Sequence, residues 1–483
     1  IGQSTHIIDY YTNYKFIETD NYNLAKIGRR WFGERFDFEN VKDFQFNFEN
    51  LKTDMPVRLK IYAAATSEIS TSMSVDVNNS PLTTLFFGSI GDPILAVADN
   101  YSSDIFLNAS ETNIRLTYNN NGNPSSSAYL DYISLEGTSD LIFNNGQLIF
   151  YNNDIDYLDQ IVSYQISNSQ DINNIWDISN ISDIKEITPQ NQNIFSFKSV
   201  FLPSNKFIAF DDNDFLIPSI GDFPEIVNQN LKEDIFSNSF GEIMPVDYLI
   251  IARSDMLNQA ERLANINREV YGLNVKVVEI QKIYNEFNSG NQDIAALRNF
   301  VRYVYNNEIN NSALKYLCLF GDASYDYKDR IPNNTNIIPS WHSLNSYSLS
   351  SSFISDDFYG MMDLGEGLMT NSDKLDIAVG RILADSNERA IDLVDKIESY
   401  YNQESYGDWR NKLMVISDDV DEPWENVIQT TSNNIADIIS ENKPFFNTKK
   451  IISDAYNQQT SSGGERYPEV KSQIINGMKQ GAL

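Results

Sequence analysis

The pattern of apolar residues changes once along this chain, close to Gly241. Before that residue, short runs that alternate apolar and polar residues are separated by clusters of Asn, Ser, Asp and Gly. Such runs, for example VRLKIYAAA at residues 57–65, are typical of strands with one buried face. Few windows here show helical periodicity, so the sequence predicts a β-sandwich of jelly-roll type over residues 1–240.

One stretch of this half carries a turn signal. Residues 141–150 read LIFNNGQLIF, with Asn144-Asn145-Gly146 between two apolar runs. Asn and Gly tolerate the left-handed backbone that a two-residue hairpin turn requires. The sequence therefore predicts a hairpin in which the two runs pair with each other.

After Gly241, apolar runs alternate with amphipathic helical patterns. The run VDYLIIA, residues 246–252, is followed by a helical pattern that ends at Gly272, as a helix C-cap would. Further strand-like runs occupy residues 273–280, 314–321, 375–382, 411–417 and 445–453. This alternation predicts an α/β domain over residues 241–483, with a mostly parallel sheet and helices on both faces.

The last helical pattern runs from about Pro468 to Lys479, and Gly481-Ala482-Leu483 reads as the first step of a returning strand. Loops at the carboxyl ends of the strands form the active site in open α/β sheets. We therefore expect the α/β domain to be truncated at its C-terminal end, with one such loop missing.

The chain is acidic, with 67 Asp and Glu residues against 36 Lys and Arg residues and a formal net charge of −31. A surface of that sign repels phosphate backbones, so nucleic acid is excluded as a partner. No apolar run reaches the roughly 20 residues of a membrane-spanning helix. One cysteine excludes an internal disulfide, and a length of 483 residues favours two domains.

Several segments resemble gingipain-type cysteine peptidases and, among these, the sortases of the type IX secretion system. In the second half they are VDYLIIA, VYGLNVKVVEI, YLCLFGDASYDYKDR, SDDFYGMMD, LDIAVGRI and DAYNQQTSSGGERYPEV. In the first half they are GRRWFGERF and NNNGNPSSSAYLDYI. The resemblance covers most of the chain, and FGDASYDY together with GGERYPEV is its most specific part.

The resemblance implies a caspase-like α/β domain in a cell-surface, outer-membrane-associated cysteine peptidase or sortase. Such an enzyme removes C-terminal sorting signals from secreted cargo and joins the cargo to a surface glycolipid. The implied partners are an outer-membrane β-barrel shuttle or anchor protein (PorV-like), other attachment-complex subunits, the cargo signal domains, and surface lipopolysaccharide as acceptor. The alternative is a non-catalytic scaffold or interaction module that docks on such a β-barrel partner.

The resemblance also implies where the catalytic His and Cys would lie. In the family the His follows a Gly at the end of the strand after the YPEV helix, and the Cys ends the strand after that. Both positions fall beyond Leu483, so no catalytic residue is assigned here, and we expect this chain alone to be inactive. Cys318 lies in an apolar run, where burial hides a thiol and raises its pKa. His342 and His6 are interpreted as ordinary, non-catalytic histidines.

Acidic residues follow several predicted strands, where loops should gather at the carboxyl edge of the sheet. Oxygen-rich loops suit Ca²⁺, and the peptidase relatives bind calcium, so Ca²⁺ is the cofactor to test although the chemistry requires none. The alternative is that these carboxylates cap helices and hold turns. The candidate metal ligands are Asp322, Asp326, Asp356 and Asp357.

The loop after LMVIS reads DDVDEPWEN, residues 418–426. In arginine-specific relatives an acidic residue of this loop recognises the basic side chain of the substrate. The resemblance therefore makes Asp418, Asp419 and Asp421 the substrate-pocket candidates, although the loop differs too much for a residue-by-residue assignment.

Overall fold

The computed structural model describes residues 3–4, 6–144, 146–153, 155–189, 193–218, 228–238, 240–309, 313–461 and 464–482. Asn145 of the predicted hairpin turn and Leu483 of the predicted last strand lie outside these residues. No described helix is long and apolar enough to span a membrane.

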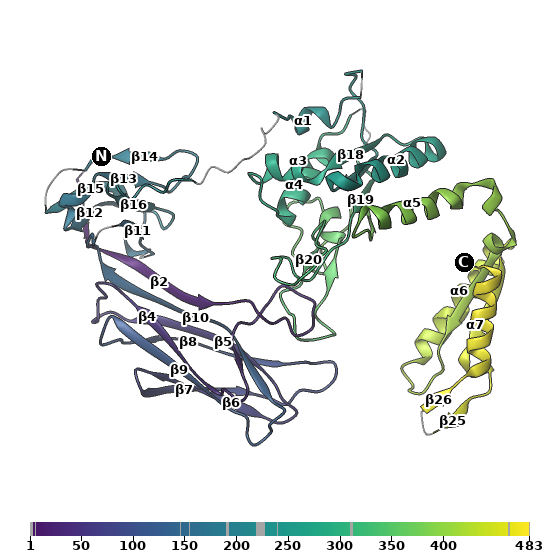
Figure 1. The fold of residues 1–483 in the computed structure, drawn as a ribbon, viewed down its shortest axis with the longest axis horizontal. Helices are drawn as coiled ribbons and strands as arrows, with labels where there is room; N and C mark the ends of the chain where they lie inside the picture. Colours follow the sequence, from purple (N-terminus) through teal and green to yellow (C-terminus); the bar gives the residue numbers. More distant parts are fainter. Residues whose placement is uncertain are drawn as a thin grey trace.

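The first unit is a β-sandwich of two antiparallel sheets, at the lower left of Figure 1. One sheet has the order β2-β10-β5-β8, with β3 paired to β10, and the other has the order β4-β9-β6-β7. Along β5, the alternate side chains of Val57, Leu59 and Ile61 are fully buried in the core between the sheets. The strands are β2 (Tyr10–Glu18), β3 (Arg35–Phe36), β4 (Val41–Asn47), β5 (Val57–Thr66), β6 (Thr71–Val77), β7 (Ser80–Phe87), β8 (Val97–Ile105), β9 (Glu111–Asn119) and β10 (Ser127–Asp140).

A second β unit follows, with its own aromatic core around Phe150, Tyr164 and Phe207. Its sheets have the orders β1-β12-β15 and β11-β16-β13-β14. The residues before 240 thus form two β units instead of the one predicted, because an alternating pattern marks a half-buried strand but not the sheet it joins. The elements are β1 (His6–Ile8), β11 (Gln147–Tyr151), η1 (Ile155–Tyr157), β12 (Ile161–Ser167), η2 (Ser169–Asp171), β13 (Asn174–Asp177), β14 (Lys185–Ile187), β15 (Ile194–Val200) and β16 (Lys206–Phe210).

The predicted hairpin at residues 141–150 is wrong. The strand β11 pairs antiparallel with β16, while Ile142 forms a parallel bridge with Ser167. Gly146 does adopt a positive φ of 74°. The left-handed Gly146 agrees with the turn signal, but the two apolar runs take different partners because each fits a separate sheet.

The α/β unit contains a parallel sheet of order β18-β17-β19-β22, as the alternation of strands and helices predicts. From β17 the chain passes through α2 to β18, on one side of β17 in the sheet. From β18 it passes through α3 and α4 to β19, on the other side of β17. Because such crossovers are right-handed, their helices cover opposite faces. Gly272 ends α2 in the left-handed conformation, φ 66°, as its position predicts. The elements are α1 (Leu231–Asp234), β17 (Tyr248–Ala252), η3 (Ser254–Met256), α2 (Leu257–Tyr271), β18 (Val275–Glu279), α3 (Ile280–Phe287), α4 (Ile294–Asn306), β19 (Tyr316–Phe320), β20 (Trp341–His342), β21 (Ile354–Ser355), η4 (Asp357–Gly360), β22 (Ala378–Ile382) and α5 (Asn387–Tyr401).

The strands after α5 do not join this sheet, which corrects the prediction of one sheet over residues 241–483. They form a separate parallel pair, β23-β24, that lies beyond the end of α5 in Figure 1. The apolar pattern of a buried strand identifies it as a strand but does not say which sheet it enters. The elements are η5 (Gln403–Ser405), η6 (Asp408–Asn411), β23 (Lys412–Ser417), α6 (Asn426–Asn442), β24 (Asn447–Ile452), η7 (Ser453–Ala455), β25 (Gln459–Ser461), β26 (Gly464–Arg466) and α7 (Pro468–Gln480).

Candidate functional site

The carboxyl edge of the four-stranded sheet is built mainly by one long segment, residues 321–355, which we call the β19 loop. Asp322 begins this loop and is bound into it by its carboxylate. That carboxylate accepts hydrogen bonds from the Thr335 hydroxyl at 2.9 Å and from the Ala323 N–H at 2.9 Å. Asp322 therefore fixes the start of the β19 loop against its middle.

Asp326 holds the next turn of the same loop. It is fully buried, and its carboxylate accepts hydrogen bonds from the backbone N–H groups of Arg330 and, at 2.6 Å, Ile331. A buried carboxylate needs such partners, because an unpaired charge in the interior is costly. This is the turn-holding role that the sequence left open as the alternative to metal binding.

Asp356 forms a two-pronged ion pair with Arg381, which lies on β22. The Nε and Nη2 atoms of Arg381 donate to the two carboxylate oxygens at 2.7 Å each. The Nη1 atom of Arg381 donates to the backbone carbonyls of Gly321 and Ile338, both at 2.8 Å. One guanidinium thus ties together β22, the start and the middle of the β19 loop, and the segment before η4.

These carboxylates do not fit a calcium site. The oxygens of Asp322, Asp326 and Asp356 accept hydrogen bonds from neighbouring groups, and Asp357 is exposed at the start of η4. Within the described residues, no three His, Cys, Asp or Glu side chains form a group that could hold a metal ion. Calcium binding stays a prediction, and the described residues offer no set of ligands for it.

The substrate-pocket candidates lie elsewhere, in the loop after β23. Asp419 accepts a hydrogen bond from the Tyr467 hydroxyl at 2.9 Å. This contact lowers the pKa of Asp419, and burial together with the same contact raises the pKa of Tyr467 to about 12. Asp418 and Asp421 are exposed, and the backbone N–H of Asp421 donates to Glu425 at 2.9 Å. Their role in substrate recognition stays a prediction.

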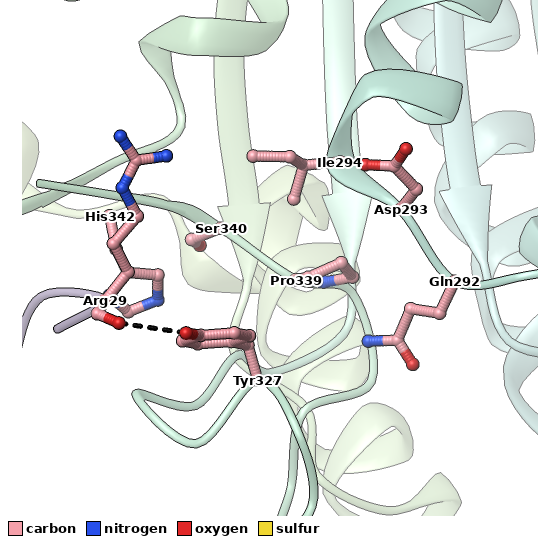
Figure 2. Close-up of a pocket in the computed structure, with 8 residues that line it drawn as sticks. All are labelled: Arg29, Gln292, Asp293, Ile294, Tyr327, Pro339, Ser340 and His342. Atoms are coloured by element: carbon pink, nitrogen blue, oxygen red, sulfur yellow. Dashed lines mark hydrogen bonds between the residues drawn. The ribbon is translucent and has the colours of Figure 1, made fainter. Parts of the chain in front are cut away.

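Sequence reasoning missed a pocket that the β19 loop forms with the first β unit and the start of α4. Its volume is about 230 Å³. Figure 2 shows its lining: Arg29, Gln292, Asp293, Ile294, Tyr327, Pro339, Ser340 and His342. The β-sandwich contributes Arg29, which lies far from the other residues in the sequence. No local motif could therefore have predicted this combination.

The pocket depends on a contact between the two units. Residues 20–33, which we call the strap, lie along the β19 loop. The Tyr327 hydroxyl donates to the Arg29 carbonyl at 2.9 Å, and the Arg29 N–H donates to the Ser343 carbonyl at 2.9 Å. Trp31 stacks on Tyr325 with ring centroids 5.6 Å apart. The strap therefore fixes both the backbone and the aromatic side chains of the loop.

Comparison with protein families assigns the α/β unit and the strands that follow it. Residues 243–483 match the model of peptidase family C25.

These residues belong to peptidase family C25.

A solved structure extends the likeness into the β region. The crystal structure of dimeric latent PorU from Porphyromonas gingivalis matches with a TM-score of 0.68 and 21% sequence identity. The match covers 84% of this chain, far more than the C25 domain alone, and 39% of the PorU chain. The fold is thus that of PorU, a β region followed by a C25 domain. This chain spans about two fifths of that relative's length.

Other solved structures match only about a quarter of this chain. A CBM36 carbohydrate-binding module in complex with calcium and xylotriose covers 25% of this chain and 98% of its own, at 14% identity. A CBM35 from Cellvibrio japonicus Abf62 covers 26% of this chain and 97% of its own, at 10% identity. Their TM-scores of 0.18 and 0.19 are too low to support an argument about function. None of the curated proteins compared with the chain matches it.

A cysteine peptidase needs a reactive thiolate, and the one cysteine of this sequence does not provide it. Cys318 lies in the middle of β19 and is only 4% exposed. Burial raises the pKa of its thiol to about 12, which keeps it protonated at neutral pH. This confirms the predicted burial of Cys318, and its place in the C25 domain is that of a small core residue.

Proposed function

We propose that this chain is the β-rich and leading peptidase part of a type IX secretion sortase. Such an enzyme cleaves the C-terminal sorting signal from secreted cargo and attaches the cargo to a surface glycolipid. The observation that supports it is the order of units shared with PorU, since the match extends well beyond the C25 domain.

The proposal gives the residues of this chain supporting roles. The nucleophile is a Cys other than Cys318, because the latter is buried and protonated. The Arg381–Asp356 pair and the carboxylates of the β19 loop hold the edge of the sheet in one shape, which places neighbouring groups for catalysis. Asp418, Asp419 and Asp421 supply negative charge for a basic side chain of the substrate. This chain by itself is inactive.

The location and partners follow from the same proposal. The enzyme acts at the cell surface in association with the outer membrane. It works with a PorV-like β-barrel protein and other attachment-complex subunits on the signal domains of cargo, with lipopolysaccharide as the acceptor. The strongly acidic surface is consistent with a partner that presents basic groups.

A gene deletion tests this proposal. In the bacterium that encodes the protein, deletion should leave secreted cargo with its C-terminal signal attached, and the complete gene supplied in trans should restore processing. Mass spectrometry of cargo from both strains measures the signal directly. Cargo that is processed normally in the deletion strain would contradict the proposal and favour the non-catalytic scaffold.

A further inference from the structure

The pocket of Figure 2 contains a buried histidine whose ring nitrogens lack partners. His342 is 5% exposed, and neither ring nitrogen makes a hydrogen bond within the described part of the chain. Burial lowers the pKa of this imidazole. The Ser324 backbone and the charge of Asp356 lie close enough to offset part of that effect, but the Ser324 contact does not have hydrogen-bond geometry. A buried polar group without a partner is costly, so a ligand that supplies one is favoured here.

A cationic side chain lines the same pocket. Arg29 lines the pocket on the same side as His342, with Tyr327 below both in Figure 2. The guanidinium of Arg29 has no ion pair among the described residues, although the chain carries a large excess of acidic groups. The strap places Arg29 there through the contacts of its backbone with Tyr327 and Ser343.

The third side of the pocket is the start of α4. A helix of 13 residues begins at Ile294, and its N-terminus carries partial positive charge. The one carboxylate that lines the pocket, Asp293, accepts a hydrogen bond from the Ala295 N–H at 2.9 Å and caps this helix. Figure 2 places Asp293 across the pocket from His342 and Arg29. The Asp293 carboxylate thus faces the first turn of α4, the helix that it caps.

We propose that this pocket binds a carboxylate group between Arg29 and His342. An Arg guanidinium and an imidazole N–H are both donors that suit a carboxylate, and the Gln292 amide offers a further donor at the pocket wall. A pocket of about 230 Å³ has room for a small group or a single terminal residue, and not for several long side chains. The carboxylate is that of a peptide, either a C-terminus or an acidic side chain, and this part rests on the proposed peptidase function.

Two histidines in the whole sequence make the test direct, because only His6 and His342 contribute imidazole signals. NMR of these signals is recorded while acetate is added at constant ionic strength to residues 1–483. We expect a saturable shift of the His342 signals and a higher pKa of His342 with acetate bound, since the anion favours the charged ring. His6, which is exposed at the start of strand β1, should not respond.

A variant pair tests the role of the guanidinium. Arg29→Met should weaken acetate binding about tenfold or more, because it removes a charge-assisted hydrogen bond. Arg389→Met, which removes another exposed guanidinium on α5, should change nothing. Arg29 is exposed, so its substitution leaves the fold intact, which the unchanged His6 signals would verify.

Two further ligands then identify the source of the carboxylate. N-acetylglycine presents a terminal carboxylate, and N-acetylaspartate with an amidated C-terminus presents a side-chain carboxylate. Tighter binding of either one, with the same loss in Arg29→Met, supports the inference and names the source. An unchanged His342 signal at about 100 mM acetate, or equal binding by Arg29→Met, overturns it. Neither result bears on cargo cleavage by the intact enzyme.

Discussion

The hydroxyl groups of Tyr62 and Tyr347 form a hydrogen bond of 2.8 Å, although 285 residues separate them in the sequence. Tyr62 lies on β5 of the sandwich, and Tyr347 lies in the β19 loop of the C25 domain. Around them, the Ala25 N–H donates to the Ser346 carbonyl, and the Leu95 N–H donates to the Tyr347 carbonyl, both at 2.9 Å. The β-sandwich is therefore a structural support of the loop that forms the edge of the peptidase sheet.

Gly28 tests this support, because its backbone packs against the β19 loop with no room for a Cβ. A Cβ on Gly28 would stand 2.0 Å from the Asn345 carbonyl oxygen, and the residue has φ +82°. We expect Gly28→Ala to lower the free energy of unfolding by about 2 to 4 kcal/mol, from backbone strain and from the displaced loop. Urea unfolding measures the stability, and limited proteolysis of the β19 loop measures its release.

Gly122→Ala is the matched control for this prediction. Gly122 has the same φ of +82° but nothing within 4 Å of the added Cβ. Its substitution should cost only about 1 kcal/mol of backbone strain and leave the β19 loop resistant to protease. Equal effects of the two substitutions would contradict the supporting role of the strap.

Arg381→Met should be among the most damaging single changes in the C25 domain. The Arg381 side chain is 8% exposed. Its loss leaves Asp356 with the Ser340 hydroxyl but without its cationic partner, and removes the Arg381 donor from two carbonyls of the β19 loop. We expect a loss of about 3 to 5 kcal/mol in unfolding free energy. Arg58→Met breaks an exposed pair with Asp104 and should lower the unfolding free energy far less than Arg381→Met does. Similar values for the two variants would show that the Arg381 network is not what stabilises the loop.

The sequence predicted the order of the units and the type of their elements well, because period-two and helical patterns follow directly from which faces are buried. It could not predict which sheet each strand joins. The strands β11 and β23 have ordinary strand patterns, yet one pairs with β16 and the other leaves the main sheet. Such choices depend on contacts between distant segments, which a local pattern does not contain.

The candidate site was predicted less completely for the same reason. The burial of Cys318 followed from its apolar neighbours, and the turn-holding role of Asp326 was one of two open interpretations. The importance of His342 was not predictable, because its pocket is completed by Arg29 from the other unit. A lone histidine in a polar loop carries no signal of the side chains that the fold brings to it.

Cys318 should resist thiol reagents as long as the protein is folded. Its burial and raised pKa leave almost no accessible thiolate at neutral pH. We expect iodoacetamide to label the urea-unfolded chain rapidly and the native chain only at the rate of unfolding, as measured by mass spectrometry. Rapid labelling of the native chain would contradict the structural role and make Cys318 a candidate nucleophile.

His342 should make stability depend on pH. Burial lowers its pKa in the folded state, so the unfolded chain binds more protons as the pH falls through the ordinary histidine range near 6.5. This contribution to stability is present above that pH and is lost below it. Of the titratable and charged groups around the ring, Tyr327 has its ring centroid 6.5 Å away and Asp356 raises the pKa, while Arg29 and Asp293 line the same pocket.

The variant His342→Gln removes this titration and should flatten the dependence of unfolding free energy on pH between about 7 and 5. The difference between the wild-type and variant curves of unfolding free energy against pH cancels the contribution of the carboxylates, because both proteins contain the same ones. Parallel curves for wild type and His342→Gln would mean that the buried imidazole does not titrate differently on folding.

The central proposal, that this chain is part of a sortase, is tested most directly by the mass of its product. The protein as its gene encodes it is purified and incubated with a cargo that ends in a C-terminal signal, together with an amine acceptor. We predict a cargo shortened by its signal and joined to the acceptor through a new amide bond, with the same yield from Cys318→Ala as from wild type. An intact cargo would contradict the account, and loss of product in the soluble, folded Cys318→Ala variant would place the nucleophile where the structure shows a buried core residue.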